Sequence, residues 1–153
     1  MEIKQFTEDY LADVFELHRE LYKFHKPHSL MKFKFKKTDA QLDSEVIQHI
    51  QAGDNILLLM EKNTCIGFLR WSYTPASNGK VALPSIDWLY IKKEFRGHGG
   101  GTALLQEAIR HMRGLYPNAP GYVISVEYWN KSARRLYEKI GFQPQQLRLY
   151  FEA

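Results

Sequence analysis

A chain of 153 residues is the size of one ordinary domain, and its 44% hydrophobic and 14% aromatic content is enough to build a packed core. The formal net charge of +4 is too small to indicate a strong nucleic-acid binder, and no apolar run approaches the ~20 residues of a membrane span. The single cysteine, Cys65, excludes an internal disulfide and fits a reducing cytoplasm. The N-terminus lacks the pattern of a secretory signal peptide. We therefore expect one soluble, cytoplasmic domain over residues 1–153 that binds neither nucleic acid nor membrane.

The first fifty residues predict a strand followed by two helices. Residues 2–6 have the pattern of a short strand, and Thr7 is placed to cap a helix whose apolar residues recur at helical spacing. Thr38 and Gln41 match the capping box at the start of a second helix. Gly53 is a typical residue at which that helix ends.

Three strands are predicted next. Residues 56–61 form a continuous apolar run, as expected for a strand that is covered on both faces. Residues 65–73 and 80–91 form the second and third strands, and Ser77-Asn78-Gly79 indicates the turn between them. Short connections of this kind favour an antiparallel meander.

The last third of the chain changes to strands alternating with helices. A helix over residues 101–115 is followed by a strand over 122–126, a helix that Asn130 caps and Gly141 ends, and a last strand over 147–151. The element order is β-α-α-β-β-β-α-β-α-β. We therefore expect an α/β fold with a mixed, mostly antiparallel central sheet and helices on both faces.

The most informative segment is a glycine-rich loop between the third strand and the third helix. Four glycines occupy five consecutive positions, and a loop of this kind lets the backbone approach a ligand closely. The helix that follows presents unpaired N–H groups and the positive end of its dipole, which together favour a phosphate or pyrophosphate. The segment runs Arg96-Gly97-His98-Gly99-Gly100-Gly101-Thr102.

Several ligands use such a loop, so the loop alone leaves alternatives open. A Walker A loop is excluded because Thr102 and Ala103 stand where Lys and Ser or Thr are required. A dinucleotide or S-adenosylmethionine enzyme would need several more strands, and only 52 residues follow Gly101. An NAD or S-adenosylmethionine enzyme and a glycine-rich helix start that binds no ligand therefore stay open as alternatives.

Two motifs in this order resemble the GNAT family of N-acetyltransferases. Residues 96–101 match the family's cofactor signature, Arg/Gln-x-x-Gly-x-Gly/Ala, and residues 86–91 look like the strand that precedes it. Residues 130–142 match its second motif, Asn-x-x-Ala-x-x-x-Tyr-x-x-x-Gly-Phe. The resemblance covers about residues 55–145, and the first fifty residues match it only in the order of their elements.

The resemblance implies an acyltransferase that uses acetyl-CoA. The loop from Arg96 to Thr102 would hold the coenzyme A pyrophosphate, and a main-chain N–H of the preceding strand would polarise the thioester carbonyl. An amine would attack that carbonyl directly, and Tyr137 would serve the leaving thiolate. The cofactor-contacting residues that the resemblance implies outside the loop are Leu89, Tyr90, Ile91, Asn130, Ala133 and Tyr137.

The proton acceptor for the amine has two candidates. Asp87 is a carboxylate inside an otherwise apolar strand, where a charge is costly unless it has a partner or a use. Glu127 follows the next strand. Each catalytic role has a structural alternative, because Tyr137 lies on an apolar helix face and Asn130 is a helix cap.

The amine acceptor is not evident from the sequence. In a fold of this kind Trp71, Tyr73, Trp88 and Trp129 would shape its pocket, and such aromatic side chains suit a small-molecule or peptide amine that carries a positive charge. We expect the histidines at 18, 25 and 28 to lie on the surface and not to bind a metal. A non-catalytic acyl-CoA sensor is the rival function, and a homodimer is compatible with either.

Overall fold

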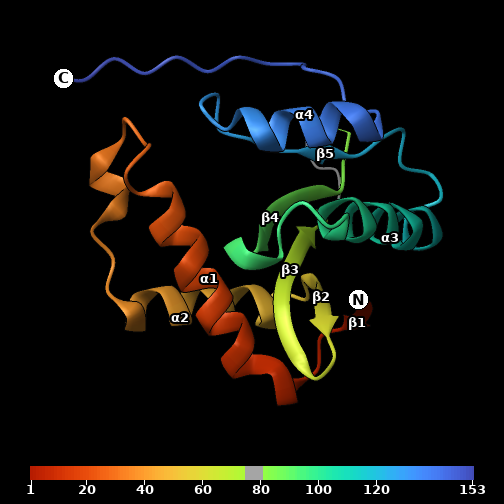
Figure 1. Ribbon diagram of the computed structural model, residues 1–153. Helices are drawn as coiled ribbons and strands as arrows, with labels where there is room; N and C mark the ends of the chain where they lie inside the picture. The colour runs from red at the N-terminus through yellow and green to blue at the C-terminus, as the bar shows by residue number, and fades with distance from the viewer. Residues whose placement is uncertain (75–80) are drawn as a thin grey trace.

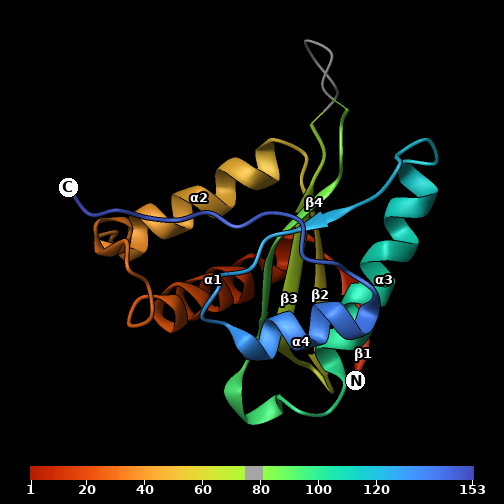
Figure 2. The same ribbon diagram turned by 90° about the horizontal axis from the view of Figure 1, so that it is seen from above.

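The computed structural model describes residues 1–74 and 81–153. A five-stranded sheet forms the middle layer, with the strand order β1-β2-β3-β4-β5. The helices α1 and α2 cover one face of the sheet, and α3 and α4 cover the other (Figures 1 and 2). The strands are β1 Glu2–Gln5, β2 Asn55–Glu61, β3 Thr64–Ser72, β4 Ser85–Ile91 and β5 Val123–Ile124. The helices are α1 Leu11–His25, α2 Asp39–Gln51, α3 Gly100–Leu115 and α4 Lys131–Ile140, with 3-10 turns η1 Glu8–Tyr10, η2 Lys32–Phe35 and η3 Lys93–Phe95.

The sheet is antiparallel except at its last pair. The neighbours β1–β2, β2–β3 and β3–β4 are antiparallel, while β4 and β5 are parallel. The predicted fold class is confirmed, and the solved structures reported below share it. Among the described residues, β4 and β5 are joined only at Ser85↔Val123 and Ile86↔Ile124. The rest of β4 therefore has an edge that no strand of the described chain covers.

Two apolar cores lie on either side of the sheet. Leu57 and Leu59 of β2 pack into the cluster with α3 and α4, while Leu58 and Met60 pack into the cluster with α1. This alternation explains why the whole apolar run of β2 is buried, as predicted for a strand covered on both faces. The free Cys65 is also buried, and burial raises the pKa of its thiol to about 11.

The helix ends follow the sequence with one exception. Thr38 and Gln41 form the predicted capping box of α2, and Asn130 accepts the backbone N–H of Ala133 at 3.2 Å to cap α4. The prediction for Thr7 was wrong, because its side chain makes no capping hydrogen bond and η1 precedes α1. Here the chain tightens into a 3-10 turn before the regular helix begins.

Two predicted strands are markedly shorter in the structure. The strand β4 begins at Ser85 rather than at residue 80, and Pro84, which has no N–H to donate, directly precedes it. The predicted turn at 77–79 lies outside the described residues. The strand β5 spans two residues instead of 122–126, because β4 and β5 diverge after Ile86.

The predicted last strand over residues 147–151 was wrong. This segment is extended but pairs with nothing in the described chain, and Leu149 and Phe151 are 87% and 92% exposed. A strand needs a neighbour for its backbone hydrogen bonds, and β5 is too short to supply one. An alternating apolar pattern alone does not create that neighbour.

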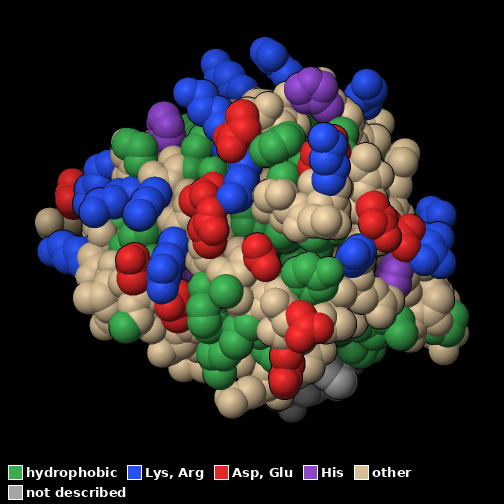
Figure 3. Space-filling model, turned by 60° about the horizontal axis from the view of Figure 1, so that its bottom comes forward, with side chains coloured by type: hydrophobic (Ala, Val, Ile, Leu, Met, Phe, Trp, Pro, Cys, Tyr) green, Lys and Arg blue, Asp and Glu red, His purple; other side chains and the backbone are tan. Residues whose placement is uncertain are grey.

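The surface carries both signs of charge. Figure 3 shows acidic and basic side chains sharing one face of the molecule. In the described ranges, no helix has the length and apolar character needed to cross a membrane.

Candidate functional site

The glycine loop connects the end of β4 to the start of α3. Gly97 and Gly99 have φ angles of +81° and +84°, in the left-handed region where glycine is strongly favoured. A Cβ at either position would meet nothing within 4 Å, so the space beside them is open. Gly99 caps α3 without a side-chain hydrogen bond. The first N–H groups of α3 therefore have no side-chain cap, and unpaired N–H groups at a helix start are what an anion site requires.

Gly100 and Gly101 have a different role from the two glycines before them. A Cβ at Gly100 would lie 2.5 Å from Leu59 Cδ2, and one at Gly101 would lie 2.9 Å from Leu136 Cδ2. These two glycines allow the first turn of α3 to pack closely against the sheet and α4. The sequence motif thus combines two glycines beside open space with two glycines that permit close packing.

The strand β4 supplies the second part of the candidate site. Leu89 and Ile91 are partly buried in the apolar cluster on the α3 and α4 side. Tyr90 points to the opposite side and packs in the cluster with α1. From Asp87 onward, β4 has no partner on the β5 side among the described residues. Its main-chain groups at that edge are therefore available to the amides of a ligand.

Tyr137 lies in the same apolar cluster as Leu89, Ile91 and Ala133. Its side chain is 8% exposed, and its ring meets Phe142 at 6.4 Å between centroids, edge to face. Burial raises the pKa of Tyr137 to about 12, so the phenol keeps its proton throughout the neutral range. Tyr137 therefore lies on the same side of the sheet as Leu89 and Ile91 of β4.

The two candidate bases lie in different surroundings. The Asp87 carboxylate is 31% exposed and accepts hydrogen bonds from Ser85 Oγ at 2.9 Å and Ser72 Oγ at 3.2 Å. Glu127 is exposed in the connection between β5 and α4. Burial lowers the pKa of His25, although the negative charge of Glu127 acts to raise it. Asp87 is thus a carboxylate held by neighbouring side chains in the sheet, and Glu127 is an exposed carboxylate in a loop.

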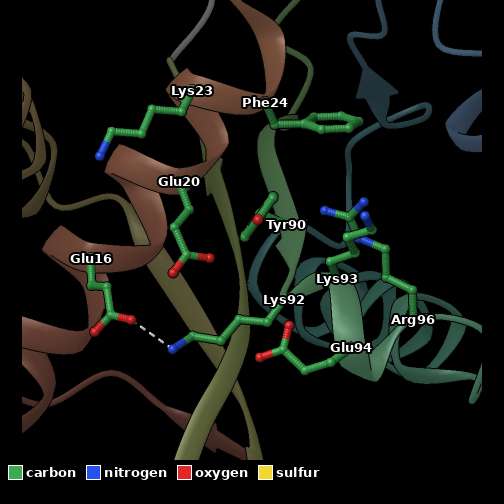
Figure 4. Close-up of a pocket in the computed structure, with 9 residues that line it drawn as sticks. All are labelled: Glu16, Glu20, Lys23, Phe24, Tyr90, Lys92, Lys93, Glu94 and Arg96. Atoms are coloured by element: carbon green, nitrogen blue, oxygen red, sulfur yellow. Dashed lines mark hydrogen bonds and ion pairs between the residues drawn. The ribbon is translucent and has the colours of Figure 1, made fainter.

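Arg96 is held toward α1 (Figure 4). Its Nε donates to the carbonyl of Ile91 at 2.8 Å, and its guanidinium lies over the rings of Phe24 and Tyr90 at 4.9 and 5.2 Å. The positive charge therefore remains at the start of the loop, as predicted, but in a fixed place against aromatic rings. His98 and Thr102 follow it in the chain, and His98 is exposed while Thr102 is partly buried.

A groove of about 680 Å³ runs between α1 and the end of β4, with Arg96 at one side (Figure 4). Charges of both signs line it, and the ion pair between Lys92 Nζ and Glu16 Oε1 at 2.7 Å spans it. This pair lowers the pKa of Glu16 and raises that of Lys92. The lining residues are Glu16, Glu20, Lys23, Phe24, Tyr90, Lys92, Lys93, Glu94 and Arg96.

The four aromatic residues expected around an acceptor pocket do not gather. Trp71 is 1% exposed and belongs to the core on the α3 side, so it cannot line a pocket. Tyr73 stacks on Tyr116 at 4.3 Å between centroids. Trp129 stacks on His28 at 4.4 Å and thereby joins the β5–α4 connection to the end of α1. Side-chain alternation along β3 turns Trp71 inward, which explains the miss.

The expectation of three surface histidines was wrong for His18. His18 is buried against Trp88, with ring centroids 4.3 Å apart, and burial lowers its pKa to about 4. Within residues 1–74 and 81–153, no three His, Cys, Asp or Glu side chains are grouped as a metal site would require.

The sequence analysis missed Arg70, which contacts the candidate site. Arg70 is 4% exposed on β3, and its Nη2 lies 3.4 Å from Asp87 Oδ2. A charged residue inside an apolar strand was the available signal, since burial of an arginine requires partners. Asp87 on β4 carries the same signal, and Arg70 carries it on β3.

Comparisons with known proteins agree with this geometry. The model of the acetyltransferase (GNAT) family matches residues 11–142. Over 71 residues the chain is 39% identical to N-alpha-acetyltransferase 40 of Saccharomyces cerevisiae. The aligned region covers 41% of this chain and 25% of that protein. The chain thus spans about a quarter of the length of this relative.

Solved structures share the fold at low sequence identity. A mutant of a Bacillus halodurans protein is 18% identical over the whole of both chains, with a TM-score of 0.83. An aminoglycoside N-acetyltransferase solved in complex with CoA is 16% identical, with a TM-score of 0.76, over 99% of this chain and 93% of that one. With the family match across most of its length, the chain belongs to the acetyltransferase (GNAT) family.

Proposed function

We propose that this protein transfers an acetyl group from acetyl-CoA to a primary amine, by direct attack within a complex that holds both substrates. The observation that carries the proposal is the glycine loop, with its open space and free N–H groups, placed beside the uncovered edge of β4. The CoA complex of a solved structure with the same fold supports the choice of ligand.

The residues present fit coenzyme A. Gly97 and Gly99 leave room beside the loop, and the start of α3 offers N–H groups and a positive dipole end to a pyrophosphate. The uncovered edge of β4, from Asp87 to Ile91, offers main-chain groups to the amides of the pantetheine arm. When bound, acetyl-CoA supplies a thioester that an amine can attack.

The residues of this chain then have three tasks. A main-chain N–H of β4 near Leu89 stabilises the negative charge that develops on the thioester oxygen. Tyr137 donates a hydrogen bond to the leaving sulfur. Because its pKa is about 12 and that of a thiol is about 8.5, full proton transfer to the thiolate would be uphill, so hydrogen bonding is the favoured contribution.

The proton of the amine goes to a carboxylate or to water that it orders. Asp87 lies at the point where β4 and β5 diverge, and Glu127 follows β5. Asn130 and Ala133, at the start of α4, complete the cofactor-contacting set. Asn130 is a helix cap in the structure, and a cofactor contact through its amide nitrogen is compatible with that role.

Direct attack is favoured over an acyl-enzyme. A ping-pong route needs a nucleophile, and the single cysteine is buried, with a thiol pKa raised to about 11. The thiolate is the nucleophilic form, so Cys65 is a poor candidate.

One relative is named an N-alpha-acetyltransferase and one solved structure an aminoglycoside N-acetyltransferase, and both names describe acetyl transfer to nitrogen. Peptide amines and small polyamines or amino sugars are therefore the acceptor classes to test. A panel of these amines with acetyl-CoA, followed by release of free thiol, tests the proposal. We expect amine-dependent release with at least one class. Tight acetyl-CoA binding without release from any amine would instead identify a non-catalytic sensor, and heat on binding NAD or S-adenosylmethionine would overturn the cofactor.

A further inference from the structure

Arg70 is the most unusual charged residue in the described chain. It lies on β3 between the sheet and the α1–α2 layer and is 4% exposed. Its Nη1 pairs with Asp54, its Nη2 lies 3.4 Å from Asp87 Oδ2, and its guanidinium lies 4.1 Å from the ring centroid of Trp88. A buried arginine with two carboxylate partners and an aromatic face has little freedom to move.

A β-bulge explains how Arg70 reaches Asp87. In the β3–β4 pairing Arg70 faces Trp88 and Trp71 faces Ile86, so Asp87 is an extra residue on β4 without an opposite partner. A bulge redirects the side chain of the extra residue. The redirected carboxylate accepts from Ser85 through Oδ1 and from Ser72 through Oδ2, and Arg70 pairs with Oδ2 as well.

The contacts fix the direction of the Asp87 carboxylate. Ser85 Oγ donates to Oδ1 and Ser72 Oγ donates to Oδ2, while Arg70 Nη2 forms an ion pair with Oδ2 at 3.4 Å. Of the roughly four acceptor sites of a carboxylate, Oδ2 therefore engages two partners and Oδ1 engages one. The side chain is still 31% exposed. One acceptor position is therefore left, beside the point where β4 and β5 diverge.

We propose that Arg70 is a positioning residue for acetyl transfer, because it holds the Asp87 carboxylate at the bulge with one acceptor position turned to the incoming amine. This inference rests on the proposed function. Arg70 itself touches neither substrate and acts through Asp87. Asp54 and His49, whose Nδ1 lies 2.9 Å from both Asp54 Oδ2 and Arg70 Nη1, anchor the other end of the guanidinium.

A double-mutant cycle tests the proposal. Arg70→Lys, Asp87→Asn and the double variant are compared with the wild type for kcat and for the acetyl-CoA KM. Lysine keeps the charge but cannot bridge two carboxylates from one planar group, so we expect kcat to fall about tenfold with the acetyl-CoA KM unchanged. If Arg70 acts through Asp87, adding Arg70→Lys to the Asp87→Asn variant should lower kcat by less than about twofold further.

Two further variants separate positioning from general destabilisation. Arg19→Lys alters another arginine–aspartate pair, between α1 and α2, and should leave kcat unchanged. Asp54→Asn removes the partner at the far end of the Arg70 guanidinium. This variant should have a lower unfolding midpoint than the wild type, and its kcat should stay above that of Arg70→Lys.

The outcomes that overturn the inference differ from those that overturn the function. Losses from Arg70→Lys and Asp87→Asn that multiply in the double variant would show that Arg70 does not act through Asp87. A kcat for Asp54→Asn as low as that for Arg70→Lys would make the role structural. Failure of the wild type to acetylate any amine would be seen before any variant is compared, and it would remove the proposed function together with this role.

Discussion

The hydroxyl of Tyr137, the proposed hydrogen-bond donor to the leaving sulfur, is a group that a single substitution can isolate. Tyr137→Phe keeps the ring and its edge-to-face contact with Phe142, and removes only the hydroxyl. We expect kcat to fall about 100-fold, the low end for removing one hydrogen-bond donor to a developing negative charge, while the acetyl-CoA dissociation constant changes little. Steady-state kinetics and calorimetry measure the two quantities. Tyr116→Phe, at the end of α3, is the matched control and should behave as the wild type.

The pH dependence adds a second test of Tyr137. Burial raises its pKa to about 12, so the phenol stays protonated at every pH below about 11. Any alkaline limb in the rate profile below that pH must then belong to another group, and Tyr137→Phe should lower the profile without changing its shape. Loss of an alkaline limb near neutral pH in this variant would contradict the assignment.

At the scale of elements, the glycine loop separates ligand contact from packing. Gly99→Asn places a side chain in open space, and asparagine tolerates a left-handed φ better than most residues. We expect a strong rise in the acetyl-CoA KM with a small change in melting temperature. Gly100→Ala should do the reverse, since its Cβ would lie 2.5 Å from Leu59 Cδ2 in the core. An unchanged KM in a folded Gly99→Asn protein would place the cofactor elsewhere.

The elements also show how far sequence reasoning reaches. Thr38 with Gln41 and Asn130 were predicted correctly because capping depends on residues a few positions apart. The strand over 147–151 was not, because pairing depends on whether a neighbour exists elsewhere in the fold. The motif predicted where the loop and Tyr137 would lie. It could not predict Arg70 at the bulge, which only the cross-strand register brings to Asp87.

At the scale of the whole molecule, His18 links stability to pH. Its folded pKa of about 4 lies below the ordinary value of 6.5 because burial disfavours the charged form, against the attraction of Glu45. As pH falls, the unfolded chain takes up a proton first, so stability that is present above pH 6.5 is lost between 6.5 and about 4. The difference corresponds to about 3 kcal/mol in the free energy of unfolding.

Urea unfolding at several pH values checks this dependence. His18→Leu removes the titrating group from the apolar layer and should flatten the loss between pH 6.5 and 4, whereas replacing the exposed His98 by Gln should not. Parallel stability curves for wild type and His18→Leu across this range would show that His18 does not control the acid sensitivity.

In the proposed mechanism, an amine attacks acetyl-CoA directly while both are bound to the protein. The measurement that tests this most directly is the initial rate of thiol release, with acetyl-CoA and an accepted amine varied together. Because Cys65 is buried with a raised thiol pKa and is a poor nucleophile for an acyl-enzyme, we expect intersecting double-reciprocal lines. Parallel lines with a stable acetylated protein, or thiol release that no amine accelerates, would contradict it.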